Sequence, residues 1–382
     1  MSDALASRFE GASLDKSLAA AWAAAGGGAS SRLTVVETRG DAVEGVHEVA
    51  AALCDASGTL LQAYGPADPV TTWRSAAKPF QLAASLDALG ATAGRAQGAT
   101  ADAGPTGGRS DLAFNDADLA LGAASHSGQA AHVEGVRALL SRFGLSESCL
   151  ACGAHAPVHG PSAEALLRTS EPARAIHNNC SGKHTFMVAA TVALGADPGA
   201  YLDPEAPIQR RIAAQVASAS GAEIRTVTDG CGAPCFVLPL SAMARAYARL
   251  AEATSKSLEN GAENSIDAGA PAPSLLGAIG RAMSQEPWWM SGDGRLDLEL
   301  VRGASEPLVS KVGAAGVLCV ALPRRGLGLA LKVLSGSDAA RPVAARLLLE
   351  QIAPGLLPPS LLSEDHLVRN VAGHVVGKRR WV

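Results

Sequence analysis

Strand-forming segments lie near both ends of this chain, and a long alanine-rich region of helix-forming sequence separates them. Residues 33–38 and 46–53 alternate or run β-branched, and residues 307–322 and 327–333 repeat that character near the other end. Segments this far apart in sequence can share one sheet if the helical middle is inserted between them. The pattern therefore predicts one α+β unit, a sheet domain with an inserted all-helical lobe.

The same pattern sets the expected domain boundaries. Residues 1–31 form a predicted N-terminal extension, and residues 32–382 form a single domain. Within that domain, residues 32–74 and 222–382 are assigned to the sheet part and residues 75–221 to the helical lobe.

Local signals place elements within these parts. Residues 55–58 are typical of a hairpin turn that leads into a strand over 59–64. Two low-complexity stretches, 91–110 and 259–274, are expected to be loops. Helices are predicted over residues 80–89, 132–143, 162–168, 184–194, 207–218, 240–253 and 339–352.

Composition and charge exclude several classes of partner. The chain has 382 residues, of which 48% are apolar, so it can bury a sizeable core. Its net charge is −4 with no basic block, which argues against nucleic acid and against an anionic membrane surface. We find neither a secretory leader nor a membrane-length apolar run, so the seven cysteines are expected to be free or metal-bound in a cytoplasmic protein.

Ser75 and Lys78 are three residues apart, which places a hydroxyl and an amine on one face of a helical turn. A neutral lysine at this spacing can take the serine proton and create a nucleophile without a histidine. Pro79 is best tolerated in a first turn, so the helix is expected to begin close to Ser75. The spacing alone is common, and a helix-capping serine beside a solvated lysine is the alternative.

Two further polar positions follow apolar segments. Ser125 comes directly after the run 119–124, where a loop is expected, and it is either a helix cap or a second active-site hydroxyl. Lys311 precedes Val312 and Gly313 in a predicted strand. Serine β-lactamases carry a Lys-Thr-Gly triplet on such a strand, whereas a solvated lysine at a sheet edge is the alternative here.

Two cysteines lie in glycine-flanked polar clusters about fifty residues apart. Cys180 and Cys231 offer thiolates, and Lys183 and His184 are the nearest candidates for a further zinc ligand. A disulfide and a nucleophilic cysteine remain alternatives. Asp229 can receive a substrate ammonium group through charge-assisted hydrogen bonds, or it can cap turn amides.

Taken together, these motifs carry a family resemblance that none of them carries alone. In this order they resemble the rhizobial-type, zinc-containing L-asparaginases, and the resemblance covers residues 33–380. The motifs are residues 74–79, 124–127, 152–155, 179–184, 228–231 and 311–313.

The resemblance implies a fold similar to serine β-lactamases and glutaminases, with an antiparallel sheet flanked by helices. It implies hydrolysis of L-asparagine to L-aspartate and ammonia, a zinc ion (Zn2+) that orients the substrate, and a homodimer.

The resemblance also assigns roles to individual residues of this chain. It makes Ser75 the nucleophile in a pair with Lys78, and it matches Ser125 and Lys311 to a second Ser-Lys pair. The metal ligands implied in this way, together with water, are Cys180, Lys183 and Cys231. The residues implied to hold the substrate are Arg74, Asn179, His184, Asp229 and Gly230.

Two other classes of function stay open. One is a serine hydrolase of the same fold that acts on other amides or on β-lactams, although the Ser-Asp-Asn triplet of that group is absent and Val312 replaces its threonine. The other is a non-catalytic metal-binding protein. Release of ammonia from asparagine distinguishes the predicted enzyme from both.

Overall fold

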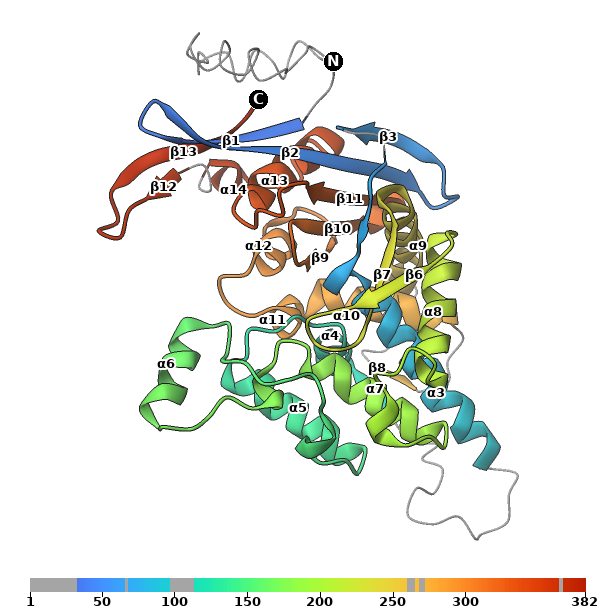
Figure 1. Ribbon diagram of the computed structural model, residues 1–382. Helices are drawn as coiled ribbons and strands as arrows, with labels where there is room; N and C mark the ends of the chain where they lie inside the picture. The colour runs from blue at the N-terminus through green and yellow to red at the C-terminus, as the bar shows by residue number, and fades with distance from the viewer. Residues whose placement is uncertain (1–32, 66–67, 97–112, 260–264, 268–271, 364–366) are drawn as a thin grey trace.

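The computed structural model describes residues 33–65, 68–96, 113–259, 265–267, 272–363 and 367–382 (Figure 1). The predicted N-terminal extension, residues 1–31, lies outside them. The described part combines one large antiparallel sheet with many helices, as predicted, and the sheet lies above the helical lobe in Figure 1.

The sheet joins the two ends of the chain. The order β12-β13-β1-β2-β11-β10-β9 is antiparallel throughout, and β3 pairs with β2 off this path. In chain order the strands are β1 Leu33–Arg39, β2 Ala42–Asp55, β3 Leu60–Tyr64, β9 Val309–Gly313, β10 Val317–Leu322, β11 Leu327–Val333, β12 Leu367–Arg369 and β13 Val375–Trp381. The β2–β3 hairpin predicted at residues 55–58 is confirmed.

Alternation along the strands gives the sheet two buried faces. In β2, Ala50 and Ala52 join the core shared with the helical lobe, whereas Val49 and Leu53 join a second core on the opposite face. Helix α9, Leu240–Glu259, packs on the first face. Helices α12, Leu296–Gly303, and α13, Ala340–Ile352, contribute to the second core, so the sheet lies between helical layers.

Most of the remaining helices lie on the lobe side in Figure 1 or connect the parts, whereas α14 lies beside α13 in the sheet part. They are α3 Lys78–Ala96, α4 Asp116–Gly122, α5 Ala130–Arg142, α6 Gly160–Arg168, α7 Ser181–Ala193, α8 Pro207–Ser220, α10 Ala272–Gln285, α11 Pro287–Met290 and α14 Pro359–Ser363. Two small sheets add β4 Val70–Thr72 with β7 Pro234–Pro239 and β6 Arg225–Thr228, and β5 Ala113–Asn115 with β8 Ser265–Asp267.

Three expectations about single elements need correction. The predicted strand 307–322 is a hairpin, because Ala315 and Gly316 adopt positive φ values of 58° and 76° and turn the chain between β9 and β10. The loop expected from residue 91 begins later, because α3 continues to Ala96, and residues 97–110 lie outside the described part. The stretch 259–274 is also no continuous loop, because β8 pairs with β5 inside it.

Two global properties follow from the described residues. All seven cysteines are free, which agrees with the expectation of unpaired thiols. None of the described helices combines the length and the apolar character needed to cross a membrane.

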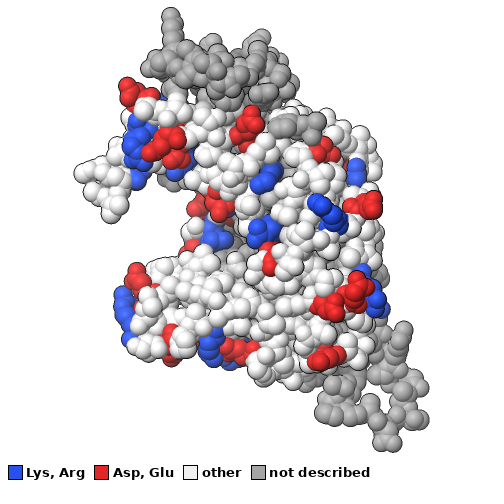
Figure 2. Space-filling model, in the orientation of Figure 1, with Lys and Arg blue, Asp and Glu red and all other residues white. Residues whose placement is uncertain are grey.

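The space-filling view shows a deep notch between the sheet part and the helical lobe, with charged side chains of both signs gathered at its inner end (Figure 2).

Candidate active site

A short 3₁₀ turn, η1 Arg74–Ala77, carries Ser75 into the start of α3. The turn is anchored from two sides, because the hydroxyl of Tyr247 donates to the carbonyl of Ala76 at 2.8 Å and the buried ring of Trp73 stacks on Phe80 with centroids 5.1 Å apart. Ser75 itself is half-buried. Its hydroxyl therefore lies on a rigid turn with access from outside.

The backbone beside Ser75 is strained. Arg74 has a φ of +53°, a left-handed conformation that costs a residue other than glycine roughly 1–2 kcal/mol. The guanidinium Nε of Arg74 donates to Asp229 Oδ1 at 2.8 Å, and the amide of Gly230 donates to the same oxygen at 2.7 Å. Three of the predicted substrate-binding residues are thus brought together, and one of them, Arg74, directly precedes Ser75 in the sequence.

Lys78 is almost fully buried, with 1% of its surface exposed. Its amine donates to Ser125 Oγ at 2.9 Å, to the carbonyl of Asn179 at 3.5 Å, and to the carbonyl of Ala124. Burial lowers the pKa of Lys78, because an ammonium ion loses hydration in the interior. Lys78 therefore joins three segments that are far apart in the sequence.

The loop after α4 holds Ser125 in place. The amide of Ser125 donates to the carbonyl of Met290 at 3.0 Å, and Ser125 is only 3% exposed. His126 lies against the start of α7, with its Nε2 2.9 Å from Ser181 Oγ. A Cβ on Gly182 would collide with the carbonyl of Leu121, so only glycine allows α7 to approach the end of α4 this closely.

Lys311 lies at the edge strand β9, but it is not solvated. Its surface is fully buried, and its Nζ lies 3.5 Å from Asp297 Oδ2. Burial lowers the pKa of Lys311 to about 8, although the negative charge of Asp297 opposes that shift, and the charge of Lys78 lowers it further. The two buried amines therefore belong to one electrostatic region.

Asp297 is the residue that sequence reasoning missed. Its Oδ1 accepts hydrogen bonds from Ser310 Oγ at 2.7 Å and from the amide of Val312 at 2.9 Å. It lies in the first turn of α12, where an acidic residue is ordinary, so no sequence signal distinguishes it. Only the packing of α12 against β9 shows that this carboxylate fastens Lys311.

The hydrogen bonds do not follow the predicted pairs. Lys78 donates to Ser125, and Lys311 contacts Asp297. Among the described residues, no side-chain hydrogen bond joins Ser75 to Lys78 or Ser125 to Lys311. A buried amine needs several acceptors at once. Lys78 finds them in the carbonyls of Ala124 and Asn179 and in the hydroxyl of Ser125.

Two thiols and an amine converge beside this region. Lys183 Nζ donates to Cys231 Sγ at 3.3 Å, and all three side chains are buried. A hydrogen bond from the Cys231 thiol holds the pKa of Cys180 well below its usual range. Burial opposes the charged form of Lys183, but the two sulfurs more than offset that effect and raise its pKa.

His184 supports the same cluster from behind. Its Nδ1 lies 2.7 Å from the hydroxyl of Tyr201, which accepts from the amide of Ala151 at 2.8 Å. The tyrosine proton is therefore directed to Nδ1, and the imidazole proton belongs on Nε2. That Nε2 is buried, and in the described part it has no hydrogen-bond partner of ordinary geometry. The neighbouring group on this side of the ring is Cys231.

This donor set fits a zinc ion. Two sulfurs and a neutral amine are ligands that zinc accepts, with water as the fourth. Lys183, whose pKa the sulfurs raise, would have to lose its proton to serve as a ligand, and the charge of the ion would favour that loss. The imidazole of His184 supplies the outer support that metal ligands commonly have. Within the described residues no cluster of three or more His, Cys, Asp or Glu side chains is placed to share a metal, so a zinc ion on the two sulfurs would need Lys183 as its third protein ligand.

Fold and site together define an α+β protein with a buried amine–hydroxyl centre between its sheet and a helical lobe. The sequence matches the family described as L-asparaginase II over residues 35–381. The chain belongs to the L-asparaginase II family, which confirms the resemblance and supports an asparaginase-type amidohydrolase.

Comparison with solved structures gives weaker similarities, of fold alone. A β-lactamase from Mycobacterium bovis is 13% identical with a TM-score of 0.40, and the match covers 79% of this chain and 94% of that one. A β-lactamase candidate from Bacteroides dorei DSM 17855 is 13% identical with a TM-score of 0.36, and the match covers 88% and 97%. No curated protein matches the chain.

Proposed function

We propose that this protein hydrolyses L-asparagine to L-aspartate and ammonia through an acyl-enzyme on Ser75. One observation carries the proposal in this chain of the L-asparaginase II family. Lys78 lies one helical turn after Ser75, and its buried amine donates a hydrogen bond to Ser125. A buried lysine with a lowered pKa is a base of the kind that serine nucleophiles use when no histidine serves them.

Acylation begins with proton transfer. Lys78 Nζ takes the proton of Ser75, and the serine oxygen forms a bond to the side-chain amide carbon of the substrate. The backbone amide of Ser75 and the positive dipole end of α3 would stabilise the oxyanion, because Pro79 has no N–H and the amide of Lys78 already donates to the carbonyl of Ser75. Exposure favours Ser75 over Ser125 as the nucleophile, since Ser75 is half-buried and Ser125 is enclosed.

The leaving group needs a proton when the carbon–nitrogen bond breaks. The Lys311 ammonium supplies it through Ser125, and ammonia leaves. Because the pKa of Lys311 is about 8, this lysine can give and regain a proton near neutral pH. Water then attacks the ester, returns a proton to the site, and releases aspartate with free Ser75.

The charged ends of the substrate find complementary groups at the notch. Arg74 is 30% exposed and Asp229 is 15% exposed, so both can be reached from solvent. We assign the α-carboxylate to Arg74 and the α-ammonium to Asp229, because each is a charge-assisted hydrogen bond. Asn179 and Gly230 are the further substrate-binding residues of the proposal, whereas His184, which is fully buried behind the thiol cluster, would act only through that cluster.

Zinc is part of the proposal as an organiser. Cys180, Cys231 and Lys183 would hold it, with Lys183 in its neutral form. The ion supplies a fixed positive charge that orients substrate-binding groups, and two thiolate ligands reduce its power to activate water. Each proton transfer above is carried by the protein's own side chains.

An ammonia-coupled assay tests the proposal. L-asparagine should give turnover with the full chain, and Ser75→Ala should lose it by at least about a thousandfold. Ser57→Ala in the exposed turn between β2 and β3 is the matched control and should retain activity. Near-full turnover in Ser75→Ala would sink the assignment.

The hydrogen bond between Lys78 and Ser125 supports a second assignment, in which Ser125 is the nucleophile and Ser75 relays the proton. Ser125→Ala separates the two. If Ser75 attacks, Ser125→Ala keeps a measurable rate because only the proton relay is impaired; if Ser125 attacks, the losses in the two variants exchange places.

A further inference from the structure

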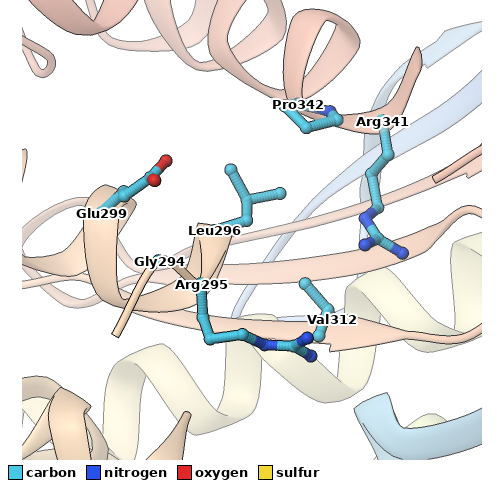
Figure 3. A pocket seen from close by; sticks show the side chains of 7 residues that line it. All are labelled: Gly294, Arg295, Leu296, Glu299, Val312, Arg341 and Pro342. Atoms are coloured by element: carbon cyan, nitrogen blue, oxygen red, sulfur yellow. The ribbon is translucent and has the colours of Figure 1, made fainter. Parts of the chain in front are cut away.

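A small pocket lies between α12, β9 and α13, close to the Lys311–Asp297 pair. It has a volume of about 280 Å³ and is lined by Arg295, Leu296, Glu299, Val312, Arg341 and Pro342 (Figure 3). This volume lies just below the range of roughly 300–1,000 Å³ that ligand sites occupy. The pocket therefore suits a small molecule or ion.

Arg341 is fixed within the wall of this pocket. Its side chain is 11% exposed, and its Nη1 donates to the carbonyl of Gly313 at 2.9 Å and to Asp338 Oδ1 at 2.7 Å. Its Nε is buried without a hydrogen-bond partner in the described part of the chain. A buried N–H that stays unpaired carries a penalty, and an acceptor inside the pocket would remove it.

Arg295 supplies a second guanidinium. It is half-buried at the N-cap position of α12, and no ion pair or hydrogen bond of its side chain is found among the described residues. In Figure 3 the guanidinium groups of Arg295 and Arg341 both extend toward Val312 on β9. Two positive groups thus approach the same hollow from different elements.

The acidic residue in the wall does not neutralise them. Glu299 accepts a hydrogen bond from Arg346 at 2.9 Å, and in Figure 3 its carboxylate lies at the left, across the pocket from the guanidinium groups of Arg295 and Arg341. Asp338, the partner of Arg341, is 69% exposed, so solvent screens its charge. The hollow therefore keeps an excess of positive charge.

We propose that this pocket binds a small oxyanion, either a phosphate or a carboxylate, between Arg295 and Arg341. Guanidinium groups favour such ligands, because their planar donors match two oxygens at once. The proposal does not depend on the proposed asparaginase activity, because binding can be measured without turnover.

The position of the pocket connects it to the candidate active site. Val312 follows Lys311 in β9, and Leu296 precedes Asp297 in α12. Arg341 holds the carbonyl of Gly313 on the same strand. An oxyanion bound here therefore contacts the two elements whose packing keeps Lys311 against its carboxylate.

Calorimetric titration of the full chain with inorganic phosphate, and separately with succinate, tests the proposal at constant ionic strength. At least one of them should bind saturably, and Arg295→Gln should weaken that binding by about tenfold or more. Arg341→Gln should do the same if it folds. The Arg295 side chain has no hydrogen bond or ion pair among the described residues, so Arg295→Gln keeps the test valid if Arg341→Gln unfolds. If only one of the two probes binds, that result shows whether the pocket takes a phosphate or a carboxylate.

Two matched variants exclude other sites. Arg324→Gln removes an exposed arginine at the end of β10 and should leave affinity unchanged. Arg74→Gln removes the arginine of the candidate active site, to which the substrate carboxylate is assigned, and should leave phosphate binding unchanged. The proposal is overturned if neither probe binds the wild-type chain, or if affinity falls in Arg74→Gln and persists in Arg295→Gln.

Discussion

The charges of two buried lysines decide what the candidate site can do. Lys78 and Lys311 are both enclosed, and burial lowers the pKa of each because a charged amine loses its hydration. Their partners differ, since Lys78 has a hydroxyl and carbonyls while Lys311 has a carboxylate. The first amine is therefore suited to accept a proton and the second to hold one.

The pairing of Lys311 with Asp297 gives a prediction for pH dependence. Because the carboxylate stabilises the ammonium, Asp297→Asn should lower the pKa of Lys311 below about 8. If Lys311 donates its proton to the leaving ammonia, activity falls as pH rises through that pKa. The alkaline limb of kcat should then move to lower pH by roughly one unit in the variant.

The matched control for this prediction is Asp338→Asn, an exposed carboxylate that pairs with Arg341. Its pH profile should match the wild type. An alkaline limb that stays fixed in Asp297→Asn, while the variant keeps its fold by circular dichroism, would remove Lys311 from the proton transfer.

Arg74 combines backbone strain with an ion pair, and the two effects on stability oppose each other. Arg74→Gly relieves a left-handed conformation worth roughly 1–2 kcal/mol and loses a partly buried ion pair worth roughly 1 kcal/mol. The free energy of unfolding should therefore change by less than about 2 kcal/mol. The KM for asparagine should rise at least about tenfold, because the proposed carboxylate contact is gone.

Urea unfolding and steady-state kinetics on the same preparation check this prediction. A variant that unfolds readily would show that Arg74 is mainly structural. An unchanged KM would remove Arg74 from substrate binding.

At the scale of single residues, the sequence predicts identities better than contacts. The clusters around Ser75, Cys180 and Asp229 do lie near one another in the structure, since Lys78 bonds Asn179 and Arg74 bonds Asp229. Which hydroxyl accepts the hydrogen bond from Lys78 depends on side-chain rotamers and on the path of the loop after α4. Neither is encoded in the spacing of a short motif.

At the scale of elements, close approach of α7 to α4 positions Cys180 and Lys183 beside the Ser125 loop. Gly182 makes this approach possible, because a Cβ there would meet the carbonyl of Leu121. Gly182→Ala should therefore destabilise the protein by roughly 1–3 kcal/mol, despite the better helix propensity of alanine. It should also weaken activity by shifting the thiol cluster.

Gly160→Ala provides the control, because Gly160 begins α6 and nothing lies within 4 Å of its added Cβ. That variant should unfold at the wild-type urea concentration or slightly above it. Equal stability of the two variants would show that α7 can shift without loss, and would contradict the packing argument.

Most strands and helices could be predicted from residue periodicity, and the failures have physical causes. Residues 307–322 are apolar almost throughout, so periodicity alone did not reveal the turn at Ala315 and Gly316. The short strand β8 exists because β5 pairs with it across the chain. Such a non-local hydrogen-bonding partner leaves no mark in a local pattern.

At the scale of the whole molecule, the insertion of the helical lobe follows from the order of the elements along the chain. The apolar strands near the N-terminus and those near the C-terminus are both buried when they share one sheet. The strand order itself depends on cross-chain pairing, such as β2 with β11, which the sequence did not specify. The division into sheet part and lobe at residues 74 and 221, the homodimer and the cytoplasmic location stay predictions.

The proposed zinc site predicts one metal ion per chain. Metal analysis of the purified protein should find zinc at about one equivalent, and Cys231→Ser should lose most of it because one soft donor is replaced by a hydroxyl. Chelation should raise KM more than it lowers kcat, since the ion orients substrate. Intrinsic fluorescence should report a retained fold.

Cys235→Ser is the control for this experiment, because Cys235 is buried in β7 only four residues away and makes no hydrogen bond to a proposed ligand in the described part. It should retain zinc. Full zinc content in Cys231→Ser, or none in the wild type grown with zinc, would remove the metal from the account.

The most direct measurement is peptide mapping of the full chain after acid quenching during turnover of L-asparagine. The account predicts an aspartyl ester on the peptide that contains Ser75, and its absence in Ser75→Ala. An ester on Ser125, a thioester on Cys180 or Cys231, or steady ammonia release by Ser75→Ala would contradict it.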